Sequence, residues 1–325
     1  MKAKPLASLS LDLDNQWTYM KIHGDSGWES FPTYLPVVVP RILRLLSERG
    51  LTITFFIVGQ DAAQSENSDA MASITAAGHE IGNHSFSHEP WFHLYSEAQC
   101  EEEIARAEEH ILRVTGQQTT GFRGPGFSSS PTLLKVLLRR GYRYDASSFP
   151  TFLGPLARLY YFLHMSGLSR QQREQRNRLF GTFRDGLQPL NPHLWRAGAL
   201  DLVEIPVTTM PFVKLPFHAS YILYLSIYST ALALAYFRTA LAMCRLAGTQ
   251  PSLLLHPLDF LGEDDTSALS FFPAMQLPAK RKVALMEQLL DIYTSEFSVV
   301  TMRQHAAQAR EVSHLQVMDS AAIIS

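Results

Sequence analysis

The first part of the chain alternates between two hydrophobic patterns, one with the period of a strand and one with the period of a helix. Short apolar runs predict strands at about 9–13, 51–58, 79–83 and 142–145. Helical spacing predicts helices at about 37–49, 69–77, 97–114 and 131–140. Strand patterns recur at 202–207 and 252–256. This alternation is typical of parallel strands joined by crossover helices, in a barrel or a doubly wound sheet.

The pattern breaks between about 150 and 200, and we interpret that stretch as an insertion within a single domain spanning 1–325. The tail after about 308 has little pattern and is expected to fray. The segment 215–237 contains no charged residue other than histidine and is nearly long enough to cross a bilayer. A crossing there would separate His256 from the polar strand ends nearer the N-terminus. We therefore interpret it as a buried or surface-docking helix that begins near Pro216.

Composition narrows the class of protein. The 325 residues are 46% hydrophobic and 18% charged, which fits a globular protein with a sizeable core. A net charge of −2 gives no basic footprint for nucleic acid. The two cysteines are far apart, and the first residues lead directly into a strand without room for a signal peptide, so we expect a cytoplasmic protein.

Contact with a membrane surface is a second expectation to be tested. Arginines are frequent at 169–178, next to an aromatic run at 159–162, and this combination suits an anionic interface or a lipid-linked phosphate. A solvated basic helix explains the same pattern and is slightly preferred.

Two carboxylates, Asp12 and Asp14, stand one residue apart where the first predicted strand ends. A buried carboxylate without a partner is costly, so the pair calls for a cation or a catalytic role. A simple turn or helix cap is the structural alternative. His84 and His88 follow another strand at a spacing that, on a helical turn, puts both rings on one face to bind one metal. Ser85 replaces the glutamate that a zinc protease would need.

Three further strand ends carry polar groups. Arg123 opens a glycine-rich turn that also contains Gly126, Asp145 ends the strand at 142–145, and His256 ends an apolar strand. Each has a structural alternative, namely a loop, a cap or a core histidine. The carboxyl ends of parallel barrel strands nevertheless meet on one face, where these groups would converge.

The order and spacing of these motifs resemble the polysaccharide deacetylase family, the carbohydrate esterases with a NodB homology domain. The acidic pair matches the spaced Asp-x-Asp form of the first family motif, and His84 to His88 match the second. Arg123 to Pro125 match the third, while Asp145 and His256 fall in the fourth and fifth. The resemblance covers about 8–148 and 200–260. Two departures are Asn15 in place of a glycine and Gly126 in place of an aromatic residue.

The resemblance implies a fold and a reaction. The fold is a distorted (β/α) barrel of about seven parallel strands, here with a helical insertion. The reaction is metal-dependent hydrolysis of an N-acyl group, acetyl or formyl, from a sugar or glycan that could be lipid-linked. The implied cofactor is one divalent metal ion, zinc first, with cobalt, nickel and iron as alternatives.

The resemblance also implies a role for each residue. The metal ligands are Asp14, His84 and His88. Asp12 is the general base, held ionised by Arg123, and His256 is the general acid for the leaving amine. A backbone N–H at Gly126 would meet the oxyanion, and Asp145 would support the catalytic groups. Two alternatives stay open, an allantoinase-like hydrolase of a small amide and a carbohydrate-binding relative without activity.

Overall fold

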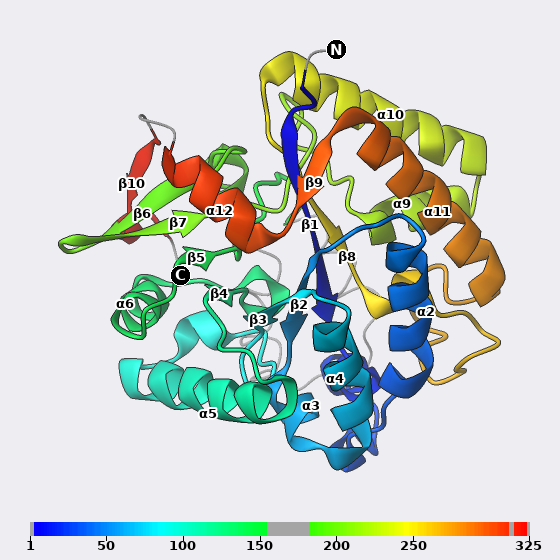
Figure 1. Ribbon diagram of the computed structural model, residues 1–325, viewed down its shortest axis with the longest axis horizontal. Helices are drawn as coiled ribbons and strands as arrows, with labels where there is room; N and C mark the ends of the chain where they lie inside the picture. The colour runs from blue at the N-terminus through cyan, green and yellow to red at the C-terminus, as the bar shows by residue number, and fades with distance from the viewer. Residues whose placement is uncertain (1–2, 155–182, 312–314, 324–325) are drawn as a thin grey trace.

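The computed structural model describes residues 3–154, 183–311 and 315–323, and these build one ten-stranded sheet (Figure 1). The strands are β1 (Leu6–Leu13), β2 (Thr54–Ile57), β3 (Glu80–Asn83), β4 (Gly121–Phe122), β5 (Tyr144–Asp145), β6 (His193–Ala197), β7 (Leu200–Glu204), β8 (Ser252–Leu255), β9 (Ser298–Val300) and β10 (Val317–Asp319). Their order is β10-β6-β7-β5-β4-β3-β2-β1-β8, with β9 also paired to β1. All pairs are parallel except β6 with β7.

Helices occupy most of the connections between strands. They are α1 (Gln16–His23), α2 (Leu35–Ser47), α3 (Gly59–Ala63), α4 (Ser68–Ala76), α5 (Glu97–Thr115), α6 (Pro131–Arg139), α9 (Ala219–Ser226), α10 (Thr230–Ala247), α11 (Ala279–Glu296) and α12 (Met302–Glu311). Figure 1 shows α2, α10 and α11 on one side of β1 and β8, with α5 and α6 near β3 to β5. The sheet is thus covered by the helices that join its strands.

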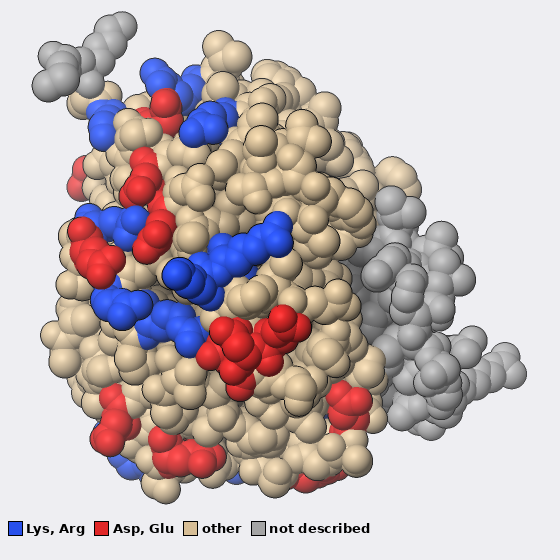
Figure 2. Space-filling model, turned by 90° about the vertical axis from the view of Figure 1, so that its right-hand side faces the viewer, with Lys and Arg blue, Asp and Glu red and all other residues tan. Residues whose placement is uncertain are grey.

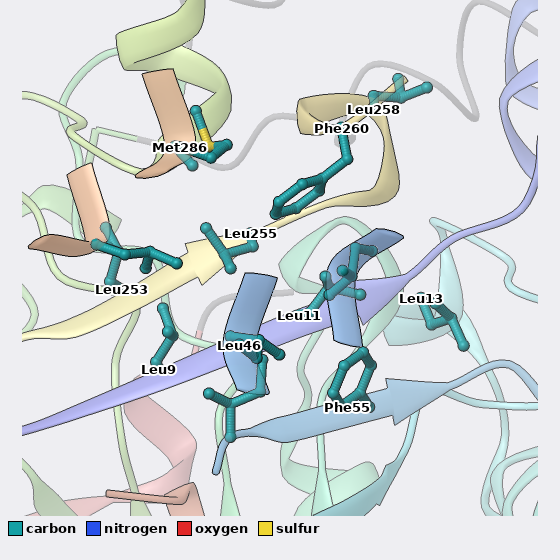
Figure 3. Packing of buried hydrophobic residues seen from close by; sticks show 14 of the residues in the cluster. Leu9, Leu11, Leu13, Leu46, Phe55, Leu253, Leu255, Leu258, Phe260 and Met286 are labelled. Carbon is teal, nitrogen blue, oxygen red and sulfur yellow. The ribbon is translucent and has the colours of Figure 1, made fainter. Parts of the chain in front are cut away.

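Strand β1 is central because its two faces serve different purposes. Leu9, Leu11 and Leu13 are fully buried against apolar side chains of neighbouring elements, as Figure 3 shows. The neighbours drawn there include residues of β2, β8, α2 and α11, namely Phe55, Leu253, Leu255, Leu46 and Met286. Burying each leucine contributes about 2 kcal/mol of transfer free energy.

The alternate residues of β1 are polar and face the opposite side. Ser8 Oγ lies 2.9 Å from His305 Nδ1 of α12, and Ser10 Oγ accepts a hydrogen bond from Arg123 at 2.9 Å. Asp12 continues this row and is also buried. The period of two therefore fixes the hydrophobic packing of the strand and at the same time lines the inside of the sheet with polar groups that end at the acidic pair.

The two parts of the sheet approach each other beyond β7. In the described residues no strand ladder joins β7 to β8. Instead, Thr208 N donates to Ser252 O at 3.1 Å, and Ser252 N donates to Thr208 Oγ1 at 2.7 Å. On its other side this segment contacts the chain just beyond β5, where Val207 N donates to Ser148 O at 2.9 Å. Among the described residues, the two parts of the sheet are therefore joined beyond β7 by hydrogen bonds of Thr208 and not by a closed strand ladder.

The predicted α/β class with a mostly parallel sheet is confirmed. The hydrophobic pattern does not reveal β6, β9 and β10, which have only three to five residues. The tail after 308 differs from the expected frayed end, because α12 continues to Glu311 and β10 pairs with β6. Most of the predicted insertion, including 159–162 and 169–178, lies outside the described residues.

The prediction of one helix across 215–237 is wrong. Pro216 forms an isolated bridge with Thr209, α9 begins at Ala219, and a break before Thr230 separates α9 from α10. The break arises because Ser229 caps a new helix, accepting a hydrogen bond from Leu232 N at 3.3 Å. Within the residues that the structure describes, no helix is long and apolar enough to cross a membrane.

The surface near α2 and α11 carries charges of both signs. Figure 2 shows this side of the molecule, with acidic and basic side chains next to one another. One ion pair on this surface joins Arg49, just beyond α2, to Asp291 of α11, with Nε and Oδ1 2.8 Å apart. Exposed pairs of this kind contribute up to about 1 kcal/mol each.

Candidate active site

The polar strand ends predicted from the sequence meet at one edge of the sheet. Asp14 follows β1, His84 follows β3, Arg123 follows β4, and His256 follows β8. These strands run parallel within the sheet, so their carboxyl ends lie on the same side. The backbone N–H of Arg123 donates to the carbonyl oxygen of Asn83, the last residue of β3, at 3.0 Å.

Asp14, His84 and His88 form a candidate metal site. One ligand atom from each lies within 4.8 Å of the others, and all three side chains are buried. Asp14 Oδ1 is 3.3 Å from His84 Nε2 and 3.1 Å from His88 Nε2. Neither contact has hydrogen-bond geometry, and both His88 nitrogens are buried without a partner in the described residues. Three converging atoms that do not satisfy one another fit a divalent cation.

The electrostatics of the three groups agree with this assignment. Burial alone would raise the pKa of Asp14, but the imidazoles of His88 and His84 outweigh it and hold that pKa well below its usual range. Burial would lower the pKa of His84, and the carboxylates of Asp12 and Asp14 raise it instead. The site therefore keeps its carboxylate ionised, as a metal ligand must be.

The two histidines are not on a helical turn, contrary to the sequence interpretation. Residues 84–89 form a loop, in which Ser85 has φ +61° and His88 has φ +50°. The loop is held by Asn83 Oδ1, which accepts from Ser85 N at 2.8 Å, and by Ser85 Oγ, which accepts from His88 N at 3.2 Å. These two left-handed residues, rather than helical periodicity, bring both rings to Asp14.

A backbone carbonyl fixes the orientation of His84. Its Nδ1 lies 2.6 Å from Arg123 O, an acceptor, so Nδ1 carries the proton and Nε2 is free to bind a cation. Two tyrosines hold the other ligand. Tyr19 donates to Asp14 Oδ2 at 3.3 Å, and Tyr34 donates to Asp14 O at 2.5 Å.

Asp12 has different partners from Asp14. Arg123 Nη1 donates to Asp12 Oδ1 at 2.8 Å and also to Ser10 Oγ. Arg123 is fully buried; its Nε donates to Ala146 O at 2.9 Å, and its guanidinium lies 4.5 Å from the centre of the Phe56 ring. A fully buried arginine needs such partners, because an isolated buried charge is strongly unfavourable.

The turn after Arg123 depends on Gly124. A side-chain carbon at Gly124 would lie 1.9 Å from Ser128 O, so no larger residue fits. Its N–H donates to Ser147 Oγ at 2.8 Å. Gly126 is exposed and has φ +57°, a conformation that favours glycine. The role of its N–H in binding an oxyanion stays a prediction.

Asp145 supports this turn and is not brought to His256. Its Oδ1 accepts from Ala146 N at 2.9 Å and from Ser147 Oγ at 2.6 Å, and it sits opposite Glu204 in the β5–β7 pair. Burial raises the pKa of Asp145 to about 6, and burial with the charge of Asp145 raises the pKa of Glu204 well above its usual range. Two buried carboxyl groups at this distance favour a state in which they share a proton, because ionising both would place two like charges together.

His256 has partners that the sequence interpretation missed. Its Nδ1 lies 3.1 Å from Ser220 Oγ, and its N–H donates to Asp259 Oδ2 at 2.8 Å. The spacing of His256 and Asp259 across a short turn beginning with Pro257 is visible in the sequence and could have indicated this carboxylate. Ser220 lies in an apolar helix and carries no comparable signal.

The family model for polysaccharide deacetylase matches residues 24–144. A peptidoglycan deacetylase from Helicobacter pylori is 33% identical over 111 residues, which is 34% of this chain and 37% of that protein. The peptidoglycan-N-acetylmuramic acid deacetylase PdaA of Bacillus subtilis is 30% identical over 120 residues, covering 37% and 42%.

The resemblance to the polysaccharide deacetylase family is confirmed.

Solved structures extend the likeness in fold to nearly the whole chain. A structure described as a putative polysaccharide deacetylase from Mycobacterium smegmatis has a TM-score of 0.62 at 20% identity, covering 98% of this chain and 96% of that one. One described as a probable polysaccharide deacetylase from Pseudomonas aeruginosa PAO1 has a TM-score of 0.60 at 17% identity, covering 97% and 93%. At these identities the likeness concerns the fold alone.

The polysaccharide deacetylase match covers only part of the candidate site. It includes His84, His88 and Arg123, whereas Asp14 and His256 lie outside it. The chain spans about two fifths of the length of the curated deacetylases that it matches. The complete constellation is therefore an observation of this structure.

One departure from the polysaccharide deacetylase motifs has a structural reason. Asn15, in the place of the usual glycine, caps α1 by accepting from Gln16 N at 2.8 Å. Its amide donates to Asp61 Oδ1 at 2.7 Å and to Thr33 Oγ1 at 2.8 Å. Asn15 therefore anchors the turn that follows the acidic pair.

Removing a ligand should abolish metal binding while removing Asp12 should not. We expect Asp14→Ala, His84→Ala and His88→Ala each to weaken zinc binding by at least about 100-fold, measured by titration calorimetry after chelation and dialysis. Asp12→Asn should bind zinc like the wild type, because Asp12 is paired with Arg123 and is not one of the three converging ligands.

His110→Ala, on α5, is the matched control for loss of a histidine. Wild-type affinity in His88→Ala, or loss of binding in the control alone, would contradict the ligand assignment.

The Asp145–Glu204 pair should make folding stability depend on pH. Carboxyl pKa values raised by folding mean that the unfolded chain releases its proton first, so stability falls as pH rises from about 4 to about 7. In the wild type we expect a loss of stability on the order of 2 kcal/mol at pH 7 relative to pH 4. Asp145→Asn supplies an amide donor to Glu204 and should remove much of this loss.

Urea unfolding of the chelated proteins at both pH values measures this difference. If the free energy of unfolding of Asp145→Asn, relative to the wild type, decreased as pH rises, the pair would not share a proton.

Proposed function

We propose that this chain is a metal-dependent deacetylase that hydrolyses the N-acetyl group of an amino sugar in a glycan. The observation that supports it most is the separation of the two carboxylates. Asp14 converges with two imidazoles, while Asp12, two residues earlier in the chain, is held by a buried arginine. Metal-dependent hydrolysis needs both a set of metal ligands and a separate general base, and here both lie at the carboxyl edge of the sheet.

The cation would be held by Asp14, His84 and His88, whose unsatisfied ligand atoms fit it. When bound, a divalent ion, zinc before cobalt, nickel or iron, supplies Lewis-acid polarisation of the scissile carbonyl. The protein contributes the orientation of these ligands through the Arg123 carbonyl and the Tyr19 hydroxyl.

The remaining side chains would move the protons. Asp12, paired with Arg123, takes a proton from the attacking water as the water oxygen bonds to the acetyl carbon. His256 gives a proton to the sugar nitrogen as the carbon–nitrogen bond breaks. The products are acetate and a free amine. We include the Gly126 N–H as a donor to the oxyanion.

The proposed substrate class is supported by the names of the relatives and by a cluster of aromatic rings that reaches His256 through His218, 6.1 Å away. The matched relatives are named peptidoglycan deacetylases, and a further one, 30% identical over 111 residues, is named chitin deacetylase of Pestalotiopsis sp. Phe127 and Phe149 stack with their ring centres 4.7 Å apart, and His218 lies 5.8 Å from Phe149. Aromatic walls with a few polar groups are typical of small-ligand sites. An N-formyl group or a lipid-linked sugar remains within this proposal.

We also propose a cytoplasmic location and a peripheral contact with a membrane, both from the amino-acid sequence. The basic and aromatic segments on which the membrane contact depends lie outside the described residues.

Asp12→Asn should separate binding from chemistry. It should retain zinc and lower kcat for acetate release from N-acetylglucosamine oligomers by about 10²–10⁴-fold, because the attacking water loses its base. Asp25→Asn, a surface change, is the control. Acetate release is measured in parallel with peptidoglycan and with a lipid-linked N-acetyl sugar. Hydrolysis of allantoin is assayed separately to test the allantoinase-like alternative.

Near wild-type turnover by Asp12→Asn would refute the base assignment. Zinc-loaded wild-type protein that releases acetate from none of these glycans would refute the proposed function.

A further inference from the structure

The two histidines of the candidate metal site are held in different ways. Nδ1 of His84 lies 2.6 Å from Arg123 O, and this contact fixes its ring. Both ring nitrogens of His88 are buried, and neither has a hydrogen-bond partner in the residues that the structure describes. A histidine that binds a metal usually donates its other ring N–H to an acceptor, which fixes the direction of the ring. The position of His88 must therefore come from the backbone that carries it.

That backbone is a loop with two residues in the left-handed region, Ser85 at φ +61° and His88 at φ +50°. Such conformations are unfavourable for residues other than glycine, and they persist only where their surroundings hold them. The N–H groups of residues 59–60, in α3, donate to the carbonyl oxygens of Ser85 and Phe86 at 2.8 and 3.0 Å. The N–H groups of Phe86 and Ser87 need partners from elsewhere.

Glu103 of α5 supplies those partners. Its Oε2 accepts from Phe86 N at 3.1 Å and from Ser87 N at 2.9 Å, and its Oε1 accepts from Ser87 Oγ at 2.6 Å. Hydrogen bonds to a carboxylate are stronger than those to a neutral acceptor, because the acceptor is charged. One side chain of α5 therefore holds the residue that comes directly before His88.

Lys21 of α1 holds the same residue through its carbonyl group. Its Nζ donates to Ser87 O at 3.0 Å and forms an ion pair with Glu89, the residue directly after His88. Both side chains of this pair are only 15% exposed, so solvent and salt screen it less than a surface pair. The ammonium group also lies 5.1 Å from the centre of the Trp28 ring. His88 thus lies between two residues that charged side chains of other elements hold in place.

We propose that Glu103 and Lys21 are positioning residues that place His88 for metal binding, as the Arg123 carbonyl does for His84. The inference rests on the metal site of the proposed function. Neither side chain binds the metal or transfers a proton in this role. Glu103 acts through two backbone N–H groups and a hydroxyl, and Lys21 acts through a backbone carbonyl and a carboxylate.

Zinc affinity, measured by titration calorimetry after chelation and dialysis, tests this role. Glu103→Ala and Lys21→Met should each weaken zinc binding by about 10- to 100-fold, which is the usual cost of losing a group that orients a metal ligand. Glu103→Gln should stay within about threefold of the wild type. Its amide oxygen can accept from both N–H groups, and its amide nitrogen can donate to Ser87 Oγ.

The matched controls remove a charge of the same sign from an exposed position. Glu102→Ala lies next to Glu103 on α5, and Lys135→Met lies on α6. Both should bind zinc like the wild type. Urea unfolding of the chelated proteins shows which variants are folded under the conditions of the titration. If Glu103→Ala does not fold, Lys21→Met carries the test.

A double substitution separates positioning from a general loss of structure. If Glu103 acts through His88, Glu103→Ala should change the residual zinc affinity of His88→Ala by less than about twofold, because the ligand that it positions is already gone.

Amide hydrogen exchange of the chelated protein gives a readout that needs no metal. In Glu103→Ala the N–H groups of Phe86 and Ser87 should exchange at least about tenfold faster than in the wild type, because they lose their acceptor. The N–H of Arg123, which donates to Asn83 O, should exchange at an unchanged rate.

The outcomes distinguish this inference from the proposed function. Wild-type zinc affinity in Glu103→Ala or in Lys21→Met would overturn the role of that residue. An equal loss of affinity on Glu103→Ala with and without His88 would also overturn the role of Glu103. If zinc binding weakens as expected but the zinc-loaded wild type releases acetate from none of the glycans, the positioning role stands and the proposed function fails. A wild type that binds no zinc would refute both.

Discussion

The buried guanidinium of Arg123 is the interaction on which the arrangement of the site depends. Its side chain holds Asp12, and the carbonyl of the same residue holds the ring of His84. One residue therefore orients a base through its side chain and a metal ligand through its backbone. Because Arg123 is wholly buried, losing either partner would leave a charge or a polar group unsatisfied in the protein interior.

That interaction is possible only because β1 has two different faces. The leucines on one face bind the strand to the helices, and Ser10 and Asp12 on the other face receive the arginine from β4. Gly124 then lets the chain turn sharply enough to bring Ser147 and Asp145 beneath it. The position of the site is thus a consequence of the hydrophobic packing of the strand that carries its two carboxylates.

The sequence could predict the fold class and the strand ends because both follow from local periodicity. It did not predict the loop geometry of His84 and His88, since a four-residue spacing looks the same on a helix and on a turn with positive φ. The contact between Asp259 and His256 could have been predicted from the sequence, because the two residues are three apart in a short turn. The contact with Ser220 could not, because a single hydroxyl in an apolar helix has meaning only once that helix is packed against β8.

The division of labour between Asp12 and Asp14 can be observed directly by anomalous diffraction from a zinc-loaded crystal. One zinc peak shared by Asp14, His84 and His88, with Asp12 still bonded to Arg123, is the predicted result. A peak coordinated by Asp12, or zinc bound away from the two histidines, would contradict the assignment of one carboxylate to the metal and the other to the chemistry.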